Sequence, residues 1–323
     1  MTPTPPTAPP SRIGLGLAAV GRPGYITLGR DADLPARRTP EALRERAFAL
    51  MDAAYERGVR YFDAARSYGR SEEYLADWLR ARPGASDAAV GSKWGYTYTA
   101  GWSTDADVHE VKDHGVDSYR RQLAETRALL GGRLGLYQIH SVTPESPALG
   151  DTALHEELAR LAAEGVAVGL STSGPRQAET VRAALEVTVG GRPLFASVQS
   201  TYNVLETSAG GALAEAHADG RTVIVKEAMA NGRLAGPHLA PDTERVARIA
   251  RDAGTTSDAL AIAAVAAQPW VDVVLSGAVT VDQLAANTDA AATAVDPDLL
   301  DRLAGAAEPA ETYWARRSRL PWH

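Results

Sequence analysis

The sequence predicts an α/β fold of one kind, a single parallel (β/α)8 TIM barrel with extended βα loops and a C-terminal tail. Three observations indicate it. Short apolar runs recur along the 323 residues, and stretches with the period of an amphipathic helix lie between them. Strand and helix alternating in this way is typical of a parallel sheet. A chain of this length also fits one barrel better than two average domains.

The expected strands are eight apolar runs rich in Val, Leu and Ala. Several show little polar alternation, which is typical of strands buried on both faces. The runs are Ile13–Val20, Val59–Ala65, Ala88–Lys93, Leu134–His140, Ala167–Ser173, Phe195–Tyr202, Thr222–Ala228 and Val271–Ala278.

The expected helices are recognised by their period and their ends. The first, Pro40–Arg57, follows Thr39 as a candidate cap and carries proline at its first position, where a missing N–H is harmless. Glycines such as Gly58 and Gly131 stand where helices should stop. The other helical stretches are Val116–Leu130, Thr152–Ala163, Pro175–Val187, Glu206–Ala218, Ser257–Ala267 and Val281–Ala291.

A doubly wound open sheet is the competing architecture. It usually carries three glycines in a phosphate-binding turn after its first strand, with a helix directly behind. Residues 14–19 supply the first two glycines and lack the third, and no helical pattern follows. We therefore assign residues 12–307 to one catalytic barrel. Residues 1–11 are expected to be a disordered tail, and residues 308–323 a C-terminal tail near the active-site mouth.

Composition excludes several classes of function. A net charge of −7 without a basic run argues against a nucleic-acid partner. No apolar stretch approaches the roughly 18 residues of a membrane span. The chain has no cysteine, which excludes disulfides and thiolate sites and fits a cytoplasmic location. Residues 1–11, rich in Thr and Pro, do not resemble a signal peptide.

Three segments are longer than ordinary loops: Gly21–Thr39, Trp94–Gly115 and Glu308–His323. Loops of this length are usually functional or disordered. The first two follow strands one and three, so they lie at the C-terminal face of the barrel, where active sites of this architecture are found.

Ionisable side chains close three successive strands. Asp63, Lys93 and His140 end the second, third and fourth apolar runs, and Tyr68 follows Asp63 by five residues. Neighbouring strand ends meet around one mouth, so a carboxylate, an ammonium, an imidazole and a phenol are expected close together. Singly, each has a commoner structural explanation, such as a cap, a packing residue or a satisfied core histidine. Four together at adjacent strand ends favour catalysis.

Carbonyl chemistry has a use for this set. A carbonyl that accepts a hydride must gain a proton on oxygen, and a phenol supplies it only if its anion is stabilised. A nearby ammonium favours the phenolate, so Lys93 is expected to lower the pKa of Tyr68. Asp63 is the candidate partner that keeps a buried Lys93 charged. His140 can hydrogen-bond the substrate oxygen.

These residues resemble the aldo-keto reductases. The resemblance rests on residues 62–69 (Phe-Asp-Ala-Ala-Arg-Ser-Tyr-Gly), 91–93 (Gly-Ser-Lys) and 138–140 (Gln-Ile-His), and it extends from about residue 12 to about residue 291. It implies an oxidoreductase that passes a hydride between a nicotinamide cofactor and a carbonyl or alcohol, such as an aldehyde, ketone, sugar or secondary metabolite. Tyr68 would be the general acid or base, Lys93 with Asp63 would tune it, and His140 would orient the carbonyl.

The resemblance also implies cofactor residues. Ser171 and Gln199 match positions that bind the nicotinamide amide, and Thr172 stands where the family has asparagine. Ser276, Gly277, Gln283 and Asn287 resemble the family's adenosine-phosphate segment, and a strand feeding a helix N-terminus is a sound anion site.

Two departures from the family pattern bear on the cofactor. Lys226, followed by Glu227, occupies the place where the family usually has an aromatic residue stacked on the nicotinamide. A cation there would repel the oxidised ring, so Lys226 is expected either to pair with Glu227 or to reach the pyrophosphate. Gln283 stands where an arginine often binds a 2′-phosphate, which leaves Arg233 as the candidate. On balance the resemblance favours NADP(H) over NAD(H), with no metal.

Aromatic residues concentrate in the long loops and the tail. Tyr25, Trp94, Tyr96 and Trp314 are the expected walls of a pocket for a small-molecule carbonyl or alcohol substrate. His109 and His114 lie in the same loop near acidic residues, where a solvated loop is the preferred interpretation over a metal cluster.

Two other functions stay open at this point. Lys226 on the seventh strand would suit a barrel lyase that forms a Schiff base with a desolvated lysine. A non-catalytic regulator that binds the cofactor is the second alternative. The exact substrate, the direction of reaction and the oligomeric state cannot be read from the sequence.

Overall fold

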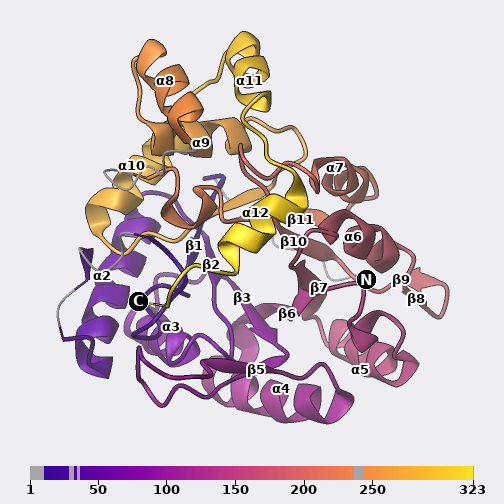
Figure 1. Ribbon diagram of the computed structural model, residues 1–323. Helices are drawn as coiled ribbons and strands as arrows, with labels where there is room; N and C mark the ends of the chain where they lie inside the picture. The colour runs from indigo at the N-terminus through magenta and orange to yellow at the C-terminus, as the bar shows by residue number, and fades with distance from the viewer. Residues whose placement is uncertain (1–10, 29–32, 35–36, 236–242, 323) are drawn as a thin grey trace.

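A closed barrel of eight parallel strands forms the centre of the protein. The computed structural model describes residues 11–28, 33–34, 37–235 and 243–322. Within them the strands follow the order β1-β12-β11-β10-β7-β6-β3-β2 around the barrel, with helices outside (Figure 1). The predicted (β/α)8 barrel is confirmed. The expected disordered tail, apart from Ser11, lies outside the described residues.

All eight predicted strands form. They are β1 (Ile13–Gly16), β2 (Tyr61–Asp63), β3 (Ala89–Trp94), β6 (Leu134–Val142), β7 (Ala167–Thr172), β10 (Ser197–Thr201), β11 (Thr222–Lys226) and β12 (Val273–Ser276). Two antiparallel hairpins of the described chain lie outside the barrel: β4 (Tyr96–Tyr98) with β5 (Glu110–Lys112), and β8 (Thr188–Val189) with β9 (Arg192–Pro193). The first of these hairpins orders the long loop after β3.

The predicted helices also form. They are α2 (Pro40–Glu56), α4 (Val116–Leu130), α5 (Thr152–Ala163), α6 (Gln177–Leu185), α7 (Gly210–Ala218), α9 (Ser257–Ala266) and α10 (Val281–Ala291). Thr39 caps α2 as expected, because its side chain accepts from the Ala42 N–H. Helix α7 begins later than expected, because the side-chain oxygen of Asn203 accepts the N–H groups of Leu205 and Glu206 in a turn.

Four further helices within the described residues were not predicted: α3 (Ser71–Ala81), α8 (Glu244–Asp252), α11 (Pro297–Ala304) and α12 (Ala310–Arg317). Short 3-10 turns lie at Gly131–Arg133, Pro147–Leu149 and Ala230–Gly232. Helix α12 belongs to the segment predicted as a C-terminal tail. Among the helices of the described ranges, none is both long and apolar enough to cross a membrane.

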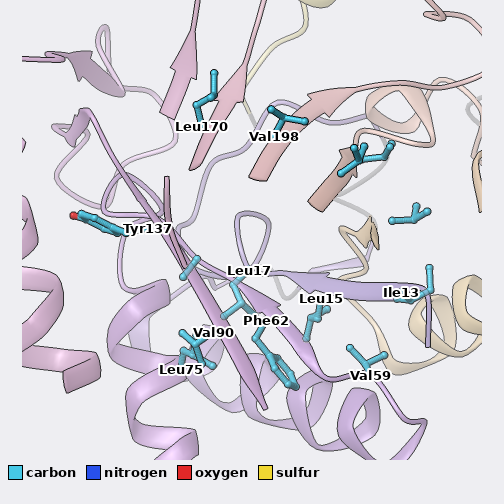
Figure 2. Close-up of a cluster of buried hydrophobic side chains, with 14 of the residues drawn as sticks. Ile13, Leu15, Leu17, Val59, Phe62, Leu75, Val90, Tyr137, Leu170 and Val198 are labelled. Carbon is cyan, nitrogen blue, oxygen red and sulfur yellow. The ribbon is translucent and has the colours of Figure 1, made fainter. Parts of the chain in front are cut away.

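Strand periodicity divides the side chains between the barrel interior and the helices. Tyr61 of β2 and Ile224 of β11 share one buried cluster although their strands are not neighbours, so they meet inside the barrel. Phe62, the next residue, instead lies 5.1 Å from Trp78 of α3, centroid to centroid. Figure 2 shows this outer layer between strands and helices, where Phe62 and Val90 lie close to Leu75 of α3. Each residue of a strand is therefore committed to one face.

Small residues keep the interior free of clashes. A side chain at Gly91 would collide with the Tyr61 hydroxyl, and one at Gly169 would collide with Ser197. Tyr61 can therefore cross the barrel only because β3 carries glycine opposite it. The layer above Tyr61, toward the carboxyl ends of the strands, is polar and forms the floor of the site.

Candidate active site

A pocket opens at the carboxyl ends of the strands. At one end it is lined by Asp63 and Tyr68, and at the other by Ser276, Gly277 and Asn287. It runs from the barrel centre to the N-terminus of α10, where the Thr280 side chain accepts from the Gln283 N–H. An elongated ligand with one end at Tyr68 and an anionic part near α10 would fit this shape.

Tyr68 and His140 lie beside one another at the barrel end of the pocket. The Tyr68 hydroxyl is 3.3 Å from His140 Nε2, and Ser67 Oγ is 3.4 Å from His140 Nδ1. Burial, together with the charges of Lys93 and Arg22, holds the pKa of His140 well below its usual value. His140 is therefore a neutral imidazole between two hydroxyl groups.

A bulge in β6 positions His140. The register between β6 and β7 shifts between Ile139 and Val142, and Ser141 has a φ of +55°. The Ser141 N–H donates to Ser171 Oγ at 2.8 Å, which fixes this unusual backbone. Bulges re-aim side chains at active sites, and this one sets the direction of His140.

Lys93 and Asp63 form a buried ion pair below Tyr68. Lys93 donates to Asp63 and, at 3.1 Å, to the Ala64 carbonyl, and its Nζ is 5.1 Å from the centre of the Tyr68 ring. Burial lowers the pKa of Lys93, and the Asp63 charge opposes this effect. Asp63 also accepts from Tyr61 at 3.0 Å and from Gln199 at 3.1 Å. These donors compensate the buried carboxylate.

The expectation that Lys93 lowers the pKa of Tyr68 is wrong for this state of the protein. Burial raises the pKa of Tyr68 well above 10, and the neighbouring Tyr25 and Asp63 add to the rise. Tyr68 is therefore a protonated phenol, which suits a proton donor.

Five of the residues expected at the cofactor line the pocket: Gln199, Lys226, Ser276, Gly277 and Asn287. Asn287 donates to Ser276 Oγ at 2.8 Å, which ties helix α10 to the end of β12. Gln199 donates to Asp63 and to Gln138, at 3.2 Å, so it also belongs to the network under Tyr68.

The other four residues expected at the cofactor contact protein groups outside the pocket lining. Ser171 is fully buried under Ser141, and Thr172, the next residue along the strand, contacts Gln177 and Ser200 on the outer side of the barrel. The Gln283 side chain accepts from the Val279 N–H at 3.0 Å and donates to Asp33 at 2.7 Å. Arg233 pairs with Glu308. The structure thus brings none of these four side chains to the pocket lining.

Lys226 has a defined place at the end of β11. Its Nζ donates to Thr201 Oγ1 at 2.7 Å and lies 3.5 Å from Glu227 Oε1, so the expected contact with Glu227 is present. Burial lowers the pKa of Lys226 to about 8, with Glu227 opposing and Arg317 adding to the shift.

The aromatic residues expected around the substrate separate into two groups. Tyr25 lines the pocket, the Tyr96 ring lies 5.1 Å from that of His140, and Trp314 lies 5.8 Å from Lys226 Nζ. Trp94 was wrongly expected in the pocket. It follows Lys93 on the strand, so it faces outward, fully buried, with its ring 5.1 Å from that of Tyr119.

Arg22 and Arg317 were not singled out in the sequence. Arg22 is almost fully buried, with its guanidinium 5.3 Å from the Tyr68 ring centre and an ion pair to Glu110. Arg317 of α12 binds Glu227 through both carboxylate oxygens. No local motif marks either arginine, since each reaches the site only through the path of a long loop or of the tail.

The histidines of the long loop have structural partners. His109 stacks on Trp322 at 4.2 Å, and His114 lies 2.8 Å from the His140 carbonyl oxygen. In the part of the chain that the structure describes, no cluster of three or more His, Cys, Asp or Glu residues is arranged to hold a metal ion.

Comparisons with known proteins identify the family. Two curated relatives match part of the chain. A pyridoxal 4-dehydrogenase of Microbacterium luteolum is 29% identical over 120 residues, which are 31% of this chain and 34% of that protein. A D-threo-aldose 1-dehydrogenase of Pseudomonas sp is 26% identical over 206 residues, 59% of this chain and 61% of that protein. The chain thus spans less than two thirds of the length of either relative.

A solved structure is similar over almost the whole chain. The holo form of the aldo-keto reductase AKR11C1 of Bacillus halodurans has a TM-score of 0.72 and 20% identity, covering 94% of this chain and 95% of that one. At this identity the likeness supports the fold alone. The model of the Aldo/keto reductase family matches residues 13–308, which is most of the chain. The chain therefore belongs to the aldo/keto reductase family.

Proposed function

We propose that the protein is a nicotinamide-dependent oxidoreductase that interconverts a carbonyl compound and its alcohol, with Tyr68 as general acid and base. One observation carries the proposal: the Tyr68 hydroxyl, 3.3 Å from neutral His140, stands above the buried Lys93–Asp63 pair on the wall of the pocket. A bound nicotinamide supplies or accepts the hydride.

The residues divide the work as follows. A substrate oxygen held between the Tyr68 hydroxyl and His140 Nε2 receives a proton from the phenol. If Ser67 donates to Nδ1, the imidazole proton stands on Nε2, ready to hold that oxygen. As the phenol loses its proton, the nearby Lys93 ammonium stabilises the phenolate. Asp63 keeps Lys93 charged, and the surrounding Tyr25 and Tyr68 rings limit the access of water.

The cofactor would lie along the pocket. Gln199 faces its nicotinamide end, and Ser276, Gly277 and Asn287 face its phosphates at the N-terminus of α10. Gly277 leaves open space beside its Cα, so backbone can approach a ligand closely there. Ser171 and Thr172, buried with other partners, would support the nicotinamide site from behind.

We further propose NADP(H) in preference to NAD(H). Arg233, the sequence candidate for a 2′-phosphate, is paired with Glu308. Arg46 of α2 is better placed, since it donates at 2.7 Å to the Val279 carbonyl just before the cap of α10. Gln283 bridges this turn to the Asp33 carboxylate, whose charge opposes a phosphate. The preference therefore depends on Arg46 outweighing Asp33.

The proposed substrates are small hydroxylated aldehydes and the corresponding alcohols or sugars. The relatives are named for an aldose and for pyridoxal, both of which carry hydroxyl groups beside an aldehyde. Tyr25 and Tyr96 provide rings against which a sugar or an aromatic aldehyde can pack, and Trp314 stands close to this wall. The cytoplasmic location stays a prediction.

Titration with NADPH and NADH, followed by tryptophan fluorescence, tests the cofactor site. Turnover with aldoses and pyridoxal then tests the reaction. Saturable quenching and cofactor-dependent turnover are expected. Tight binding without turnover on any carbonyl or alcohol would favour a cofactor-binding regulator. No binding in either titration or in calorimetry would overturn the proposal. Borohydride trapping of Lys226 with a carbonyl compound would then be the test for a Schiff-base lyase.

A further inference from the structure

Lys226 presents a positive charge to the pocket that its surroundings do not cancel. Its acidic neighbour, Glu227, accepts from Arg317 with both carboxylate oxygens, at 3.1 and 2.9 Å from Nε. Glu227 and Arg317 thus balance each other, and Lys93 is balanced by Asp63. The group formed by Lys226, Glu227 and Arg317 therefore carries a net charge of about +1 at the pocket wall.

The reacting end of a cofactor must come close to this charge. The proton donor and the hydride donor act on the same carbonyl group, so a reactive ring has to lie at the end of the pocket lined by Tyr68. Lys226 lines the same pocket, and its charge helps to lower the pKa of His140, which lies beside Tyr68. The other end, at Ser276 and Asn287, suits the phosphates. The ring that changes charge during the reaction therefore lies within the electrostatic influence of Lys226.

A nicotinamide ring is positively charged when oxidised and neutral when reduced. We propose that the Lys226 ammonium disfavours the oxidised ring and so makes the site select the reduced cofactor. This inference rests on the proposed function. By linkage, a site that binds the reduced form more tightly makes the bound oxidised form a better hydride acceptor. The site would thus favour alcohol oxidation: the alcohol carbon gives a hydride to the ring, and its oxygen gives a proton to solvent by way of Tyr68.

The choice of lysine rather than arginine supports this role. The chain has three lysines, Lys93, Lys112 and Lys226, among 33 basic residues. Arginine stays charged at all accessible pH values, whereas a buried lysine can lose its proton. Lys226 can therefore relieve its repulsion of an oxidised ring by releasing a proton, which an arginine in its place could not do.

The surroundings of Lys226 set the pH at which this happens. Charged groups act on it from its own strand end (Glu227), from α12 (Arg317) and from β3 (Lys93), and its pKa is about 8. Its other contacts, Thr201 and Trp314, do not ionise near neutral pH. At pH 7 Lys226 is mostly charged, and at pH 9 it is mostly neutral. If the oxidised ring binds only when Lys226 is neutral, the dissociation constant of the oxidised cofactor falls about tenfold from pH 7 to pH 9.

Binding of NADP⁺ and NADPH to the wild-type protein tests the inference, measured by fluorescence quenching at pH 7 and pH 9. Both ligands share the same phosphates, so phosphate ionisation cancels in their ratio. Wild type is expected to prefer NADPH about tenfold more strongly at pH 7 than at pH 9. Lys226→Met should show a lower, pH-independent ratio. Lys226→Arg should keep the preference for NADPH at both pH values, because its charge persists.

Lys112→Met is the matched control, because Lys112 is exposed and donates to the Ser141 carbonyl at the same mouth. Its ratio should follow that of wild type. An unchanged ratio in Lys226→Met would overturn the inference. An equal loss of affinity for both ligands would also overturn it, by assigning Lys226 to the shared phosphates. If wild type binds neither NADP⁺/NADPH nor NAD⁺/NADH, the proposed function fails as well.

Discussion

Arg317, the last residue of helix α12, holds Glu227 at the end of strand β11. Its guanidinium donates to both oxygens of the carboxylate, and Glu227 adopts a φ of +62°, which is costly for a residue with a side chain. Helix α12 is thereby fixed over the strand ends, where Figure 1 shows it in yellow across the barrel. The C-terminal segment is thus part of the site.

The first prediction concerns this ion pair. The Glu227 side chain is only 7% exposed. Arg317→Met therefore leaves a nearly buried carboxylate without the guanidinium that binds both of its oxygens. Removal of one partner from such a pair is expected to cost about 3 kcal/mol of unfolding free energy. Chemical denaturation measures this cost. Arg319→Met in the same segment, exposed and outside the pair, should change stability little.

The pair should also make stability depend on pH. Although burial alone raises it, the charges of Arg317 and Lys226 hold the pKa of Glu227 at about 2. A carboxylate with a lowered folded-state pKa stabilises the protein above its unfolded value and loses that contribution as pH falls. Wild type should therefore lose stability relative to Arg317→Met between about pH 4.5 and pH 2. Parallel curves over that range would contradict this assignment.

A second prediction separates proton transfer from binding. Tyr68→Phe removes the hydroxyl that faces His140 and leaves the ring in place. Loss of a general acid is expected to lower kcat by about 100-fold to 10,000-fold. The dissociation constant for NADPH should stay close to that of wild type. Tyr55→Phe on the outer helix α2 serves as control, because its hydroxyl donates to Gly84 and Asp87, away from the pocket. Equal turnover in Tyr68→Phe and Tyr55→Phe would remove Tyr68 from the mechanism.

A third prediction concerns the Lys93–Asp63 pair. Lys93→Met leaves the buried Asp63 carboxylate without its ion-pair partner, so it should lower the free energy of unfolding by about 3 kcal/mol or more. The double variant Asp63→Asn/Lys93→Met removes both charges, so it should be more stable than the sum of the two single changes implies. Denaturation of the four proteins forms the cycle. Strict additivity would mean that the two charges do not interact in the folded protein.

The sequence predicted the barrel because its strands are buried on both faces and its helices carry clear ends. It also placed Asp63, Lys93 and His140 at one mouth, since strand ends must converge there. It misplaced Trp94 because proximity in sequence was taken for proximity in space. Strand alternation sends Lys93 inward and Trp94 outward toward Tyr119, and this alternation was available from the sequence.

Other features depend on tertiary contacts that no local pattern encodes. Helix α3 lacks a side-chain cap at its start and buries polar Glu72 near its beginning, where Ser92, Thr126 and Arg66 bind the carboxylate. The pKa of Tyr68 likewise depends on how deeply the closed barrel and the first loop bury the phenol. Only the folded chain contains this information.

The last prediction concerns the choice between NADP(H) and NAD(H). Arg46 stands at the turn before α10 through its bond to the Val279 carbonyl, where the positive end of the helix also lies. Arg46→Met should weaken NADPH binding by about tenfold and leave NADH binding nearly unchanged, because only NADPH carries the extra phosphate. Asp33→Asn removes an opposing charge beside Gln283 and should strengthen NADPH binding selectively. Fluorescence titrations of both variants measure the affinities for NADPH and NADH.

If Arg46→Met weakens the binding of both cofactors alike, Arg46 stabilises the turn rather than binding the 2′-phosphate. If neither change alters the ratio of affinities, the 2′-position of the cofactor lies elsewhere, and Arg233 becomes the residue to test by releasing it from Glu308.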